Sequence, residues 1–139
     1  MDIQTRVKES FEKQHFLKHI GAKLETIEEG KVSISIERDR NLTQQTDFLH
    51  AGVTTTIADS AAGYAAMTMT PEGSEVLSVE FKVNLMRPAA GDRFIAHGHV
   101  IKPGRQLSVV EAEVVDLDSG KIISKFQGTM IRIEEGINE

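Results

Sequence analysis

The chain of 139 residues contains no cysteine, no tryptophan, one tyrosine and three prolines. Without cysteine, disulfides, thiolate zinc sites, iron–sulfur clusters and cysteine nucleophiles are excluded together. No run of about 18 apolar residues is present that could span a bilayer, and the polar start of the chain lacks the apolar segment of a signal peptide. We therefore expect a cytoplasmic protein that does not enter a membrane.

Basic residues are also few, because 16 Lys and Arg stand against 21 Asp and Glu, which gives a formal charge of −5. A protein that follows a phosphate backbone needs a dense basic patch and stacking aromatic side chains. The composition therefore predicts no nucleic-acid partner, although a local basic spot could hold a small anion. The length fits a single domain over residues 1–139, large enough to form a core without disulfides or metal ions.

Hydrophobic patterning predicts two helices and six strands. Ile3, Val7 and Phe11 recur at four-residue spacing, as on one face of a helix, and Gly21 ends that helix. Short turns separate the last four strands, which indicates that these strands pair with their neighbours in sequence. The predicted helices cover residues 1–20 and 51–69, the predicted strands cover residues 22–28, 31–37, 75–87, 92–102, 106–116 and 121–133, and residues 38–49 form a loop.

The last four predicted strands are about twice the usual five or six residues, and strands of that length twist strongly. The sheet is therefore expected to curl around another element. The helix over residues 51–69 is rich in alanine, so it is slim enough to lie inside the curve with its backbone close to the strands. The predicted fold is a single α+β domain in which a curved antiparallel sheet wraps a long central helix.

Asp59 is the only charged residue between Ala51 and Pro71. A helix with no other charge is expected to be buried on every side, and a carboxylate within it must be paired, hydrogen-bonded, protonated or functional. Thr55 and Thr56 lie beside Asp59 at helical spacing. Two interpretations are open: the threonines satisfy a structural Asp59, or Asp59 takes part in catalysis or binding.

Three segments of the sequence resemble the hotdog-fold acyl-CoA thioesterases of the PaaI-like type, from phenylacetic acid degradation. They are FLHAGV (residues 48–53), IADSAAG (57–63) and SVEFKVNLMRPA (78–89), and the order of elements agrees over nearly the whole chain. In that family a His-Gly-Gly turn opens the central helix, and an acidic residue about two turns later acts in catalysis. His50, Ala51 and Gly52 match the turn, with Ala51 in place of the first glycine, and Asp59 matches the acid.

The resemblance implies an acyl-CoA thioesterase that acts on aryl or medium-chain acyl groups. The N–H groups of Ala51 and Gly52 would hold the developing oxyanion at the amino end of the helix. Asp59 would act as a general base on water or as a nucleophile that forms an anhydride.

The resemblance also suggests roles for three neighbouring side chains. Ser78 would assist Asp59, because family members carry a hydroxyl near the catalytic water. His50 and Gln44 would orient the carbonyl or the leaving sulfur, and Gln44 stands where several relatives carry asparagine. His50 has a second interpretation, as a residue that only caps the helix.

Asp59 lies seven residues beyond Gly52, which is about 10 Å along a helix axis. One helix therefore cannot bring both parts of the site to the same carbonyl. Asp59 and Ser78 of one subunit are expected to face Gln44 and the helix start of another, related by a two-fold axis. This predicts an obligate homodimer, and the resemblance implies that such dimers often pair into tetramers.

Coenzyme A is anionic, so a protein of charge −5 needs a local patch for its phosphates. The turn Lys102-Pro103-Gly104-Arg105 is the main candidate, because it offers backbone N–H groups between two cations. Arg87 is a second candidate. Ordinary solvated turn charges are the alternative interpretation. No cofactor is expected, since CoA is part of the substrate.

His97 and His99 share one face of a strand, and His15 and His19 are one helical turn apart. Neither pair has an evident third ligand, so no metal site is predicted. Two other functions stay open: a hotdog dehydratase that acts on hydroxyacyl thioesters, and a non-catalytic module that binds acyl-CoA or aryl ligands.

Overall fold

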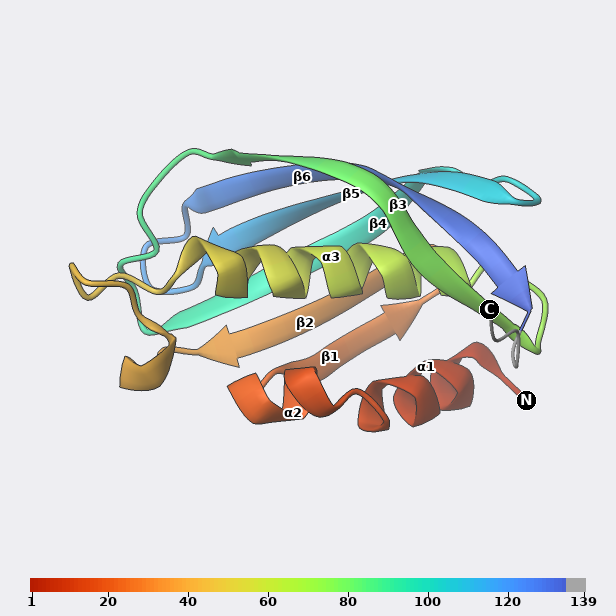
Figure 1. The fold of residues 1–139 in the computed structure, drawn as a ribbon, viewed down its shortest axis with the longest axis horizontal. Coiled ribbons are helices and arrows are strands. Elements are labelled where there is room, and N and C mark those ends of the chain that lie inside the picture. The colour runs from red at the N-terminus through yellow and green to blue at the C-terminus, as the bar shows by residue number, and fades with distance from the viewer. Residues whose placement is uncertain (135–139) are drawn as a thin grey trace.

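The computed structural model describes residues 1–134, so the last five residues of the predicted domain lie outside the described residues. The described residues form three helices and six strands, whose arrangement can be followed in Figure 1. The helices are α1 (Ile3–Glu12), α2 (His15–Ile20) and α3 (Ala51–Met67), with a short 3-10 turn, η1 (Arg40–Leu42); the strands are β1 (Lys23–Glu28), β2 (Lys31–Glu37), β3 (Ser74–Leu85), β4 (Arg93–Lys102), β5 (Leu107–Asp116) and β6 (Ile122–Glu134). Among the described residues, no helix is both long and apolar enough to cross a bilayer.

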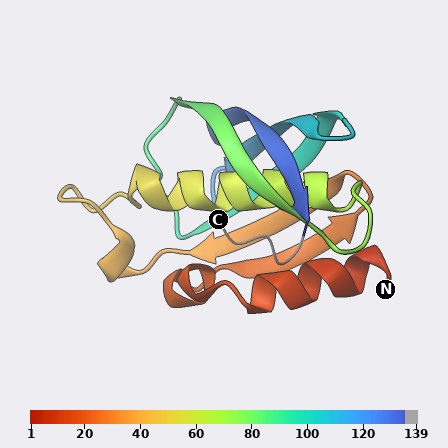
Figure 2. The same cartoon turned by 45° about the vertical axis from the view of Figure 1, so that its right-hand side comes forward.

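The six strands form one antiparallel sheet in the order β1-β2-β4-β5-β6-β3. The sheet curls so that β1 and β2 lie on one side of α3 and β3 and β6 on the other (Figures 1 and 2). Long strands twist, and the accumulated twist bends the sheet around the helix. The predicted α+β architecture, with a central helix wrapped by a curved antiparallel sheet, is confirmed.

The predicted pairing of β3 with β4 is wrong. Strand β3 pairs with β6 at the edge of the sheet, and β2 takes the place beside β4. The connection over residues 86–92 is not a tight turn, because it crosses from one edge of the sheet to its middle and Ala89 accepts a hydrogen bond from the Leu49 N–H at 3.0 Å. Placing β2 beside β4 buries Val32, Ile34 and Ile36 against the core, a gain that turn length does not reveal.

The predicted helix over residues 1–20 is interrupted at Lys13 and Gln14, so α1 and α2 are separate helices. Gln14 has extended backbone angles, φ −84° and ψ 98°, and its side chain donates a hydrogen bond to the Tyr64 hydroxyl at 2.6 Å. Because Gln14 and Tyr64 are far apart in sequence, the spacing of apolar residues does not reveal this contact or the break in the helix. Gly21 ends α2 in the left-handed conformation with φ 79°, as predicted.

Helix α3 lies very close to β4. A Cβ added to Gly98 would stand 2.3 Å from the carbonyl carbon of Ala61 and 2.5 Å from the nitrogen of Ala62, so the helix backbone occupies the space of a side chain. Ala61 and Ala62 are fully buried in this contact. The prediction that small residues let the helix backbone approach the strands is confirmed.

One face of α3 is not covered by the sheet. The prediction of a helix buried on every side is wrong for the single chain, because small and polar side chains at helical spacing stay partly exposed. They are Gly52, Thr55, Thr56, Asp59, Ser60 and Gly63.

We predict that Gly98→Ala lowers the free energy of unfolding by about 1–3 kcal/mol or more, because the new methyl group meets backbone atoms that cannot rotate away. Gly63→Ala on α3 is the matched control: its Cβ would lie 3.7 Å from the Met130 methyl group, and alanine favours the helix by up to about 1 kcal/mol. Chemical denaturation of both variants measures the difference. Equal stability of the two variants would contradict the close packing of α3 on β4.

Candidate active site

The amino end of α3 is capped by His50. Its ring nitrogen Nδ1 accepts a hydrogen bond from the Gly52 N–H at 2.8 Å, so His50 caps the helix, and its role in orienting the substrate stays a prediction. This bond occupies the Gly52 N–H. The Ala51 N–H, by contrast, takes part in no hydrogen bond among the described residues. One backbone donor with the positive end of the helix dipole behind it is therefore unused at this position.

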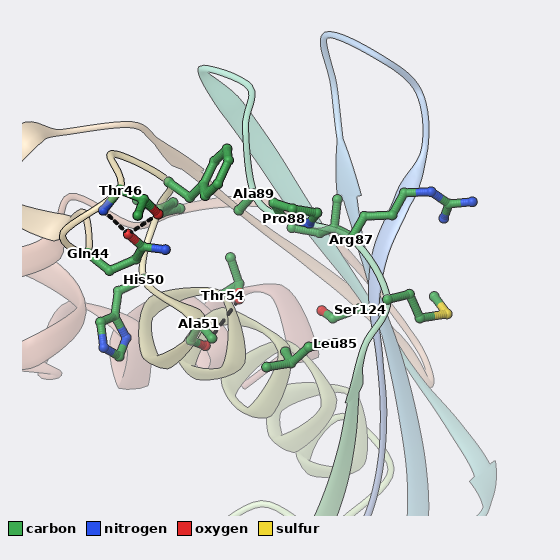
Figure 3. Close-up of a pocket in the computed structure, with 14 residues that line it drawn as sticks. Gln44, Thr46, His50, Ala51, Thr54, Leu85, Arg87, Pro88, Ala89 and Ser124 are labelled. Carbon is green, nitrogen blue, oxygen red and sulfur yellow. Dashed lines mark hydrogen bonds between the residues drawn. The ribbon is translucent and has the colours of Figure 1, made fainter.

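A pocket of about 510 Å³ lies at this helix end, between the loop before α3, the end of β3 and the start of β6. Gln44, His50 and Ala51 all line it (Figure 3). The Gln44 side-chain oxygen accepts hydrogen bonds from the backbone N–H and the hydroxyl of Thr46. These bonds fix the amide so that its nitrogen, a donor, points toward the pocket in Figure 3. The residues that line the pocket thus include two donors near the start of α3, the backbone N–H of Ala51 and the side-chain amide of Gln44.

Asp59 lies half-buried on α3, and its partner is Ser78 of β3, whose hydroxyl donates to Asp59 Oδ1 at 2.6 Å. The interpretation that threonines satisfy Asp59 is wrong, since the Thr56 hydroxyl donates to the Gly52 carbonyl at 2.8 Å and Thr55 makes no bond to Asp59. Burial raises the pKa of Asp59 above the ordinary aspartate value, and the hydrogen bond from Ser78 partly offsets the rise.

Asp59 and Ser78 line a second pocket of about 230 Å³, separate from the pocket at the start of α3. Ala51 and Asp59 are eight residues apart, which is about 12 Å along the axis. Within one chain the structure therefore brings Gln44, His50 and Ala51 together, and Asp59 and Ser78 together, but it does not bring the two groups to one point.

The residues predicted to bind CoA lie at two ends of the molecule. The Arg87 guanidinium donates to the Ile122 carbonyl at 2.6 Å and points away from the pocket in Figure 3. Lys102 and Arg105 flank the β4–β5 turn, at the opposite end of the sheet from the start of α3 (Figure 1). In that turn the Gly104 N–H donates to the Ser108 hydroxyl at 3.2 Å, and neither Lys102 nor Arg105 forms an ion pair within residues 1–134. CoA binding at these positions stays a prediction.

Of the residues that line the Asp59 pocket, only Asp59 and Ser78 were predicted as site residues, and those that the prediction lacks include Ser10, Gln14 and Tyr64. Tyr64 is the only tyrosine of the chain and follows Asp59 by five residues on the same helix, so the sequence holds a signal for it. Ser10 and Gln14 come from the far end of the sequence, and only the docking of α1 against α3 brings them to the pocket.

The histidine pairs form no evident metal site. Among residues 1–134, no group of three or more His, Asp or Glu side chains is placed to hold a metal ion. His97 shares a hydrogen bond with Ser33 at 2.8 Å on the outer face of the sheet, and His99 lies 4.0 Å from Glu111.

A curved antiparallel sheet around one long helix is the architecture of the hotdog class of α+β proteins. The chain belongs to the thioesterase superfamily, whose family model matches residues 46–123, more than half of the chain. The matched segment contains the start of α3 together with Asp59 and Ser78.

Known proteins agree with this membership. A thioesterase family protein from Silicibacter pomeroyi is 40% identical, with a TM-score of 0.92 over 95% of this chain and 98% of that one. Human acyl-coenzyme A thioesterase 13 is 28% identical over 72% of this chain and 71% of its own length. The E. coli PaaI protein from the phenylacetic acid degradation operon shares the fold, with a TM-score of 0.86 and 23% identity over 94% and 93% of the two chains.

We predict that the Asp59 carboxyl titrates above an ordinary aspartate and that Ser78→Ala raises its pKa further, because the lost hydrogen bond stabilises only the charged form. Carbon-13 NMR titration of the Asp59 carboxyl measures both values. Asp2 is an internal reference, since the pKa of its carboxyl is lowered by hydrogen bonds from Thr5. A Ser78→Ala titration that is unchanged or shifted downward would contradict the assigned hydrogen bond.

Proposed function

We propose that the chain hydrolyses aryl or medium-chain acyl-CoA thioesters to the free acid and CoA, with Asp59 as the catalytic carboxylate in a site shared by two subunits. Thioester hydrolysis is the chemistry that membership of the superfamily supports. The observation that carries the finer proposal is the half-buried Asp59, held by Ser78 and placed apart from the unused N–H of Ala51.

The Ala51 N–H would receive the thioester carbonyl oxygen. Negative charge develops on that oxygen as the carbonyl is attacked, and a fixed donor at the positive end of a helix stabilises it more than it stabilises the neutral carbonyl. The Gln44 amide nitrogen supplies a second donor from the same pocket. The Gly52 N–H donates to His50, so it would not bind the oxyanion. Gly52 would instead contribute to the shape of the turn, and His50 would hold the turn in that shape.

Asp59 would act on the other side of the carbonyl. As a general base, it would take a proton from a water that adds its oxygen to the carbonyl carbon; as a nucleophile, it would form an anhydride that water then cleaves. Both routes expel the CoA thiolate and both require the charged carboxylate. Ser78 holds one carboxylate oxygen and leaves the other for the reaction.

A second copy of the chain would bring the two groups together. Edge strand β3 and the residue after it carry large apolar side chains that are between 46% and 59% exposed in the single chain, an arrangement that favours pairing with another strand. They are Leu77, Val79, Phe81, Leu85 and Met86. The uncovered small and polar face of α3 lies beside this strand. A two-fold contact that pairs the two β3 edges would cover both surfaces and create two sites.

The same contact would explain the distant position of the basic turn. Lys102 and Arg105 lie far from the start of α3 in their own chain (Figure 1). A CoA molecule bound at the start of α3 in one subunit would therefore reach the basic turn of the other subunit. Pairing of dimers into tetramers and location in the cytoplasm stay predictions.

We predict that Asp59→Asn lowers kcat/KM for acyl-CoA by about 10²–10⁴-fold, because the amide has the shape of the acid but cannot accept the proton. Colorimetric detection of released thiol from a panel of acyl-CoAs measures the change. Glu80→Gln, a neutralised carboxylate on β3 that lines neither pocket, is the control for a simple loss of charge. Full activity of Asp59→Asn would contradict its catalytic role.

The same panel separates the alternative functions. Tight binding of acyl-CoA by the wild-type protein without thiol release would support a non-catalytic module. Loss of water from a hydroxyacyl-CoA, with the thioester left intact, would support a dehydratase.

We predict that a mixture of Ala51→Pro and Asp59→Asn chains recovers activity that neither variant has alone. Proline removes the Ala51 N–H but suits the first position of a helix, and the extended backbone of His50 suits a residue before proline. Random exchange of the two variant chains makes half of the dimers mixed. Each mixed dimer has one intact site and one site that lacks both groups, so the mixture should reach roughly a quarter of the wild-type activity. Native mass spectrometry verifies the exchange, and mixed dimers without activity would refute the shared site.

A further inference from the structure

The pocket at the start of α3 is lined by a buried hydroxyl group that has no hydrogen-bond partner. Ser124 lies on β6 and lines this pocket, and its residue is only 2% exposed. Among the buried side-chain oxygen and nitrogen atoms of residues 1–134, Ser124 Oγ alone forms no hydrogen bond. An unsatisfied buried polar group lowers the stability of the folded state. For stability alone, alanine would therefore be the better residue at this position.

The other buried serines of the described strands each have a hydrogen-bond partner. They are Ser33, Ser35, Ser74 and Ser108, whose partners are His97, Glu25, Arg132 and Gly104. Of these five serines, Ser124 is the one that lines the pocket at the start of α3. The missing partner of Ser124 is thus specific to its place in the pocket and is not a general property of serines in this sheet.

The Ser124 hydroxyl is directed at the space where a ligand would enter. Its oxygen points away from β6 toward the start of α3 in Figure 3. The nearby Thr54 hydroxyl donates its own proton to the Ala51 carbonyl at 3.1 Å. Leu85, which pairs with Ser124 across the strands, is 59% exposed, so its side chain can turn aside as a ligand enters. The Ser124 proton is therefore available to a group in the pocket.

Three donors from separate segments line this pocket: the Ala51 N–H, the Gln44 amide nitrogen and the Ser124 hydroxyl. A carbonyl oxygen has two lone pairs, whereas the oxyanion that forms when the carbonyl carbon is attacked has three. A third donor therefore gains a full acceptor only after attack has begun. Such a donor stabilises the transition state more than it stabilises the bound substrate.

We propose, on the basis of the proposed thioesterase function, that Ser124 is a third oxyanion donor, whose hydroxyl donates to the thioester oxygen as negative charge develops on it. The hydroxyl keeps its proton and forms no covalent bond. Because it has no partner in the free protein, it breaks no existing hydrogen bond when it turns to the oxyanion. The stability that the free protein loses at Ser124 then reappears as stabilisation of the transition state.

Kinetics of Ser124→Ala test the catalytic part of the proposal. We expect kcat for acyl-CoA hydrolysis to fall by about tenfold to a hundredfold, at or below the roughly 10²–10³-fold loss caused by removal of a main oxyanion donor, because two donors remain. KM should change by less than about twofold, since the third donor acts after binding. Colorimetric detection of released thiol measures both constants.

Thermal unfolding of the same variant tests the missing partner. Removal of an unsatisfied buried hydroxyl should raise Tm by about 2–6 °C. Ser35→Ala is the matched control, because Ser35 is a strand serine of similar burial that lines neither pocket and donates to Glu25 at 2.6 Å. Its Tm should fall while its kcat stays at the wild-type value. A merely structural role of Ser124 would instead lower Tm and activity together.

The outcomes separate this inference from the proposed function. An unchanged or lower Tm of Ser124→Ala would show that the hydroxyl has a partner, such as a buried water or the second subunit, and would overturn the proposal. An unchanged kcat, with or without a rise in KM, would overturn it as well. Both results leave the thioesterase proposal intact, whereas a wild-type protein that releases no thiol from any acyl-CoA would overturn both.

Discussion

The close contact between α3 and β4 determines the geometry of the whole molecule. Gly98 leaves no side chain between the strand and the helix, so the backbone at Ala61 and Ala62 lies against the sheet itself. A protein interior cannot be compressed further to move a helix already in backbone contact. The position of α3 along β4 is thereby fixed, and with it the positions of the two features on α3 that carry chemistry, the unused N–H of Ala51 and the carboxylate of Asp59.

The same rigid helix explains why one chain holds two half-sites. Ala51 and Asp59 are separated by more than two helical turns and cannot be drawn together by bending, because the helix is fixed along its length. Each half-site is completed locally: His50 caps the helix start and Ser78 holds Asp59. The apolar edge of β3 and the uncovered face of α3 lie where a second chain could supply the other half. Quaternary structure and catalysis are then two results of one geometric constraint.

The amino-terminal helices, which family resemblance says little about, connect to the same region. The break between α1 and α2 places Gln14 on the Tyr64 hydroxyl, and Arg6 anchors α1 to the turn after α3. Burying an arginine requires that its donors be satisfied, and three backbone or hydroxyl oxygens of residues 70 and 71 satisfy them. Residues from the start of the chain thus line the same pocket as Asp59.

Local pattern in the sequence was sufficient to determine the hairpin of β1 and β2, the long strands, the extent of α3 and the isolation of Asp59, because alternation, helical spacing and the absence of charge are properties of neighbouring residues. Only the tertiary structure decided that β3 pairs with β6, that α1 ends before Gln14, that Ser78 and not a threonine holds Asp59, and that His50 occupies the Gly52 N–H. These features depend on contacts between residues distant in sequence or on the exact direction of a side chain. Their energies are set by burial and hydrogen-bond geometry, which periodicity and spacing do not contain.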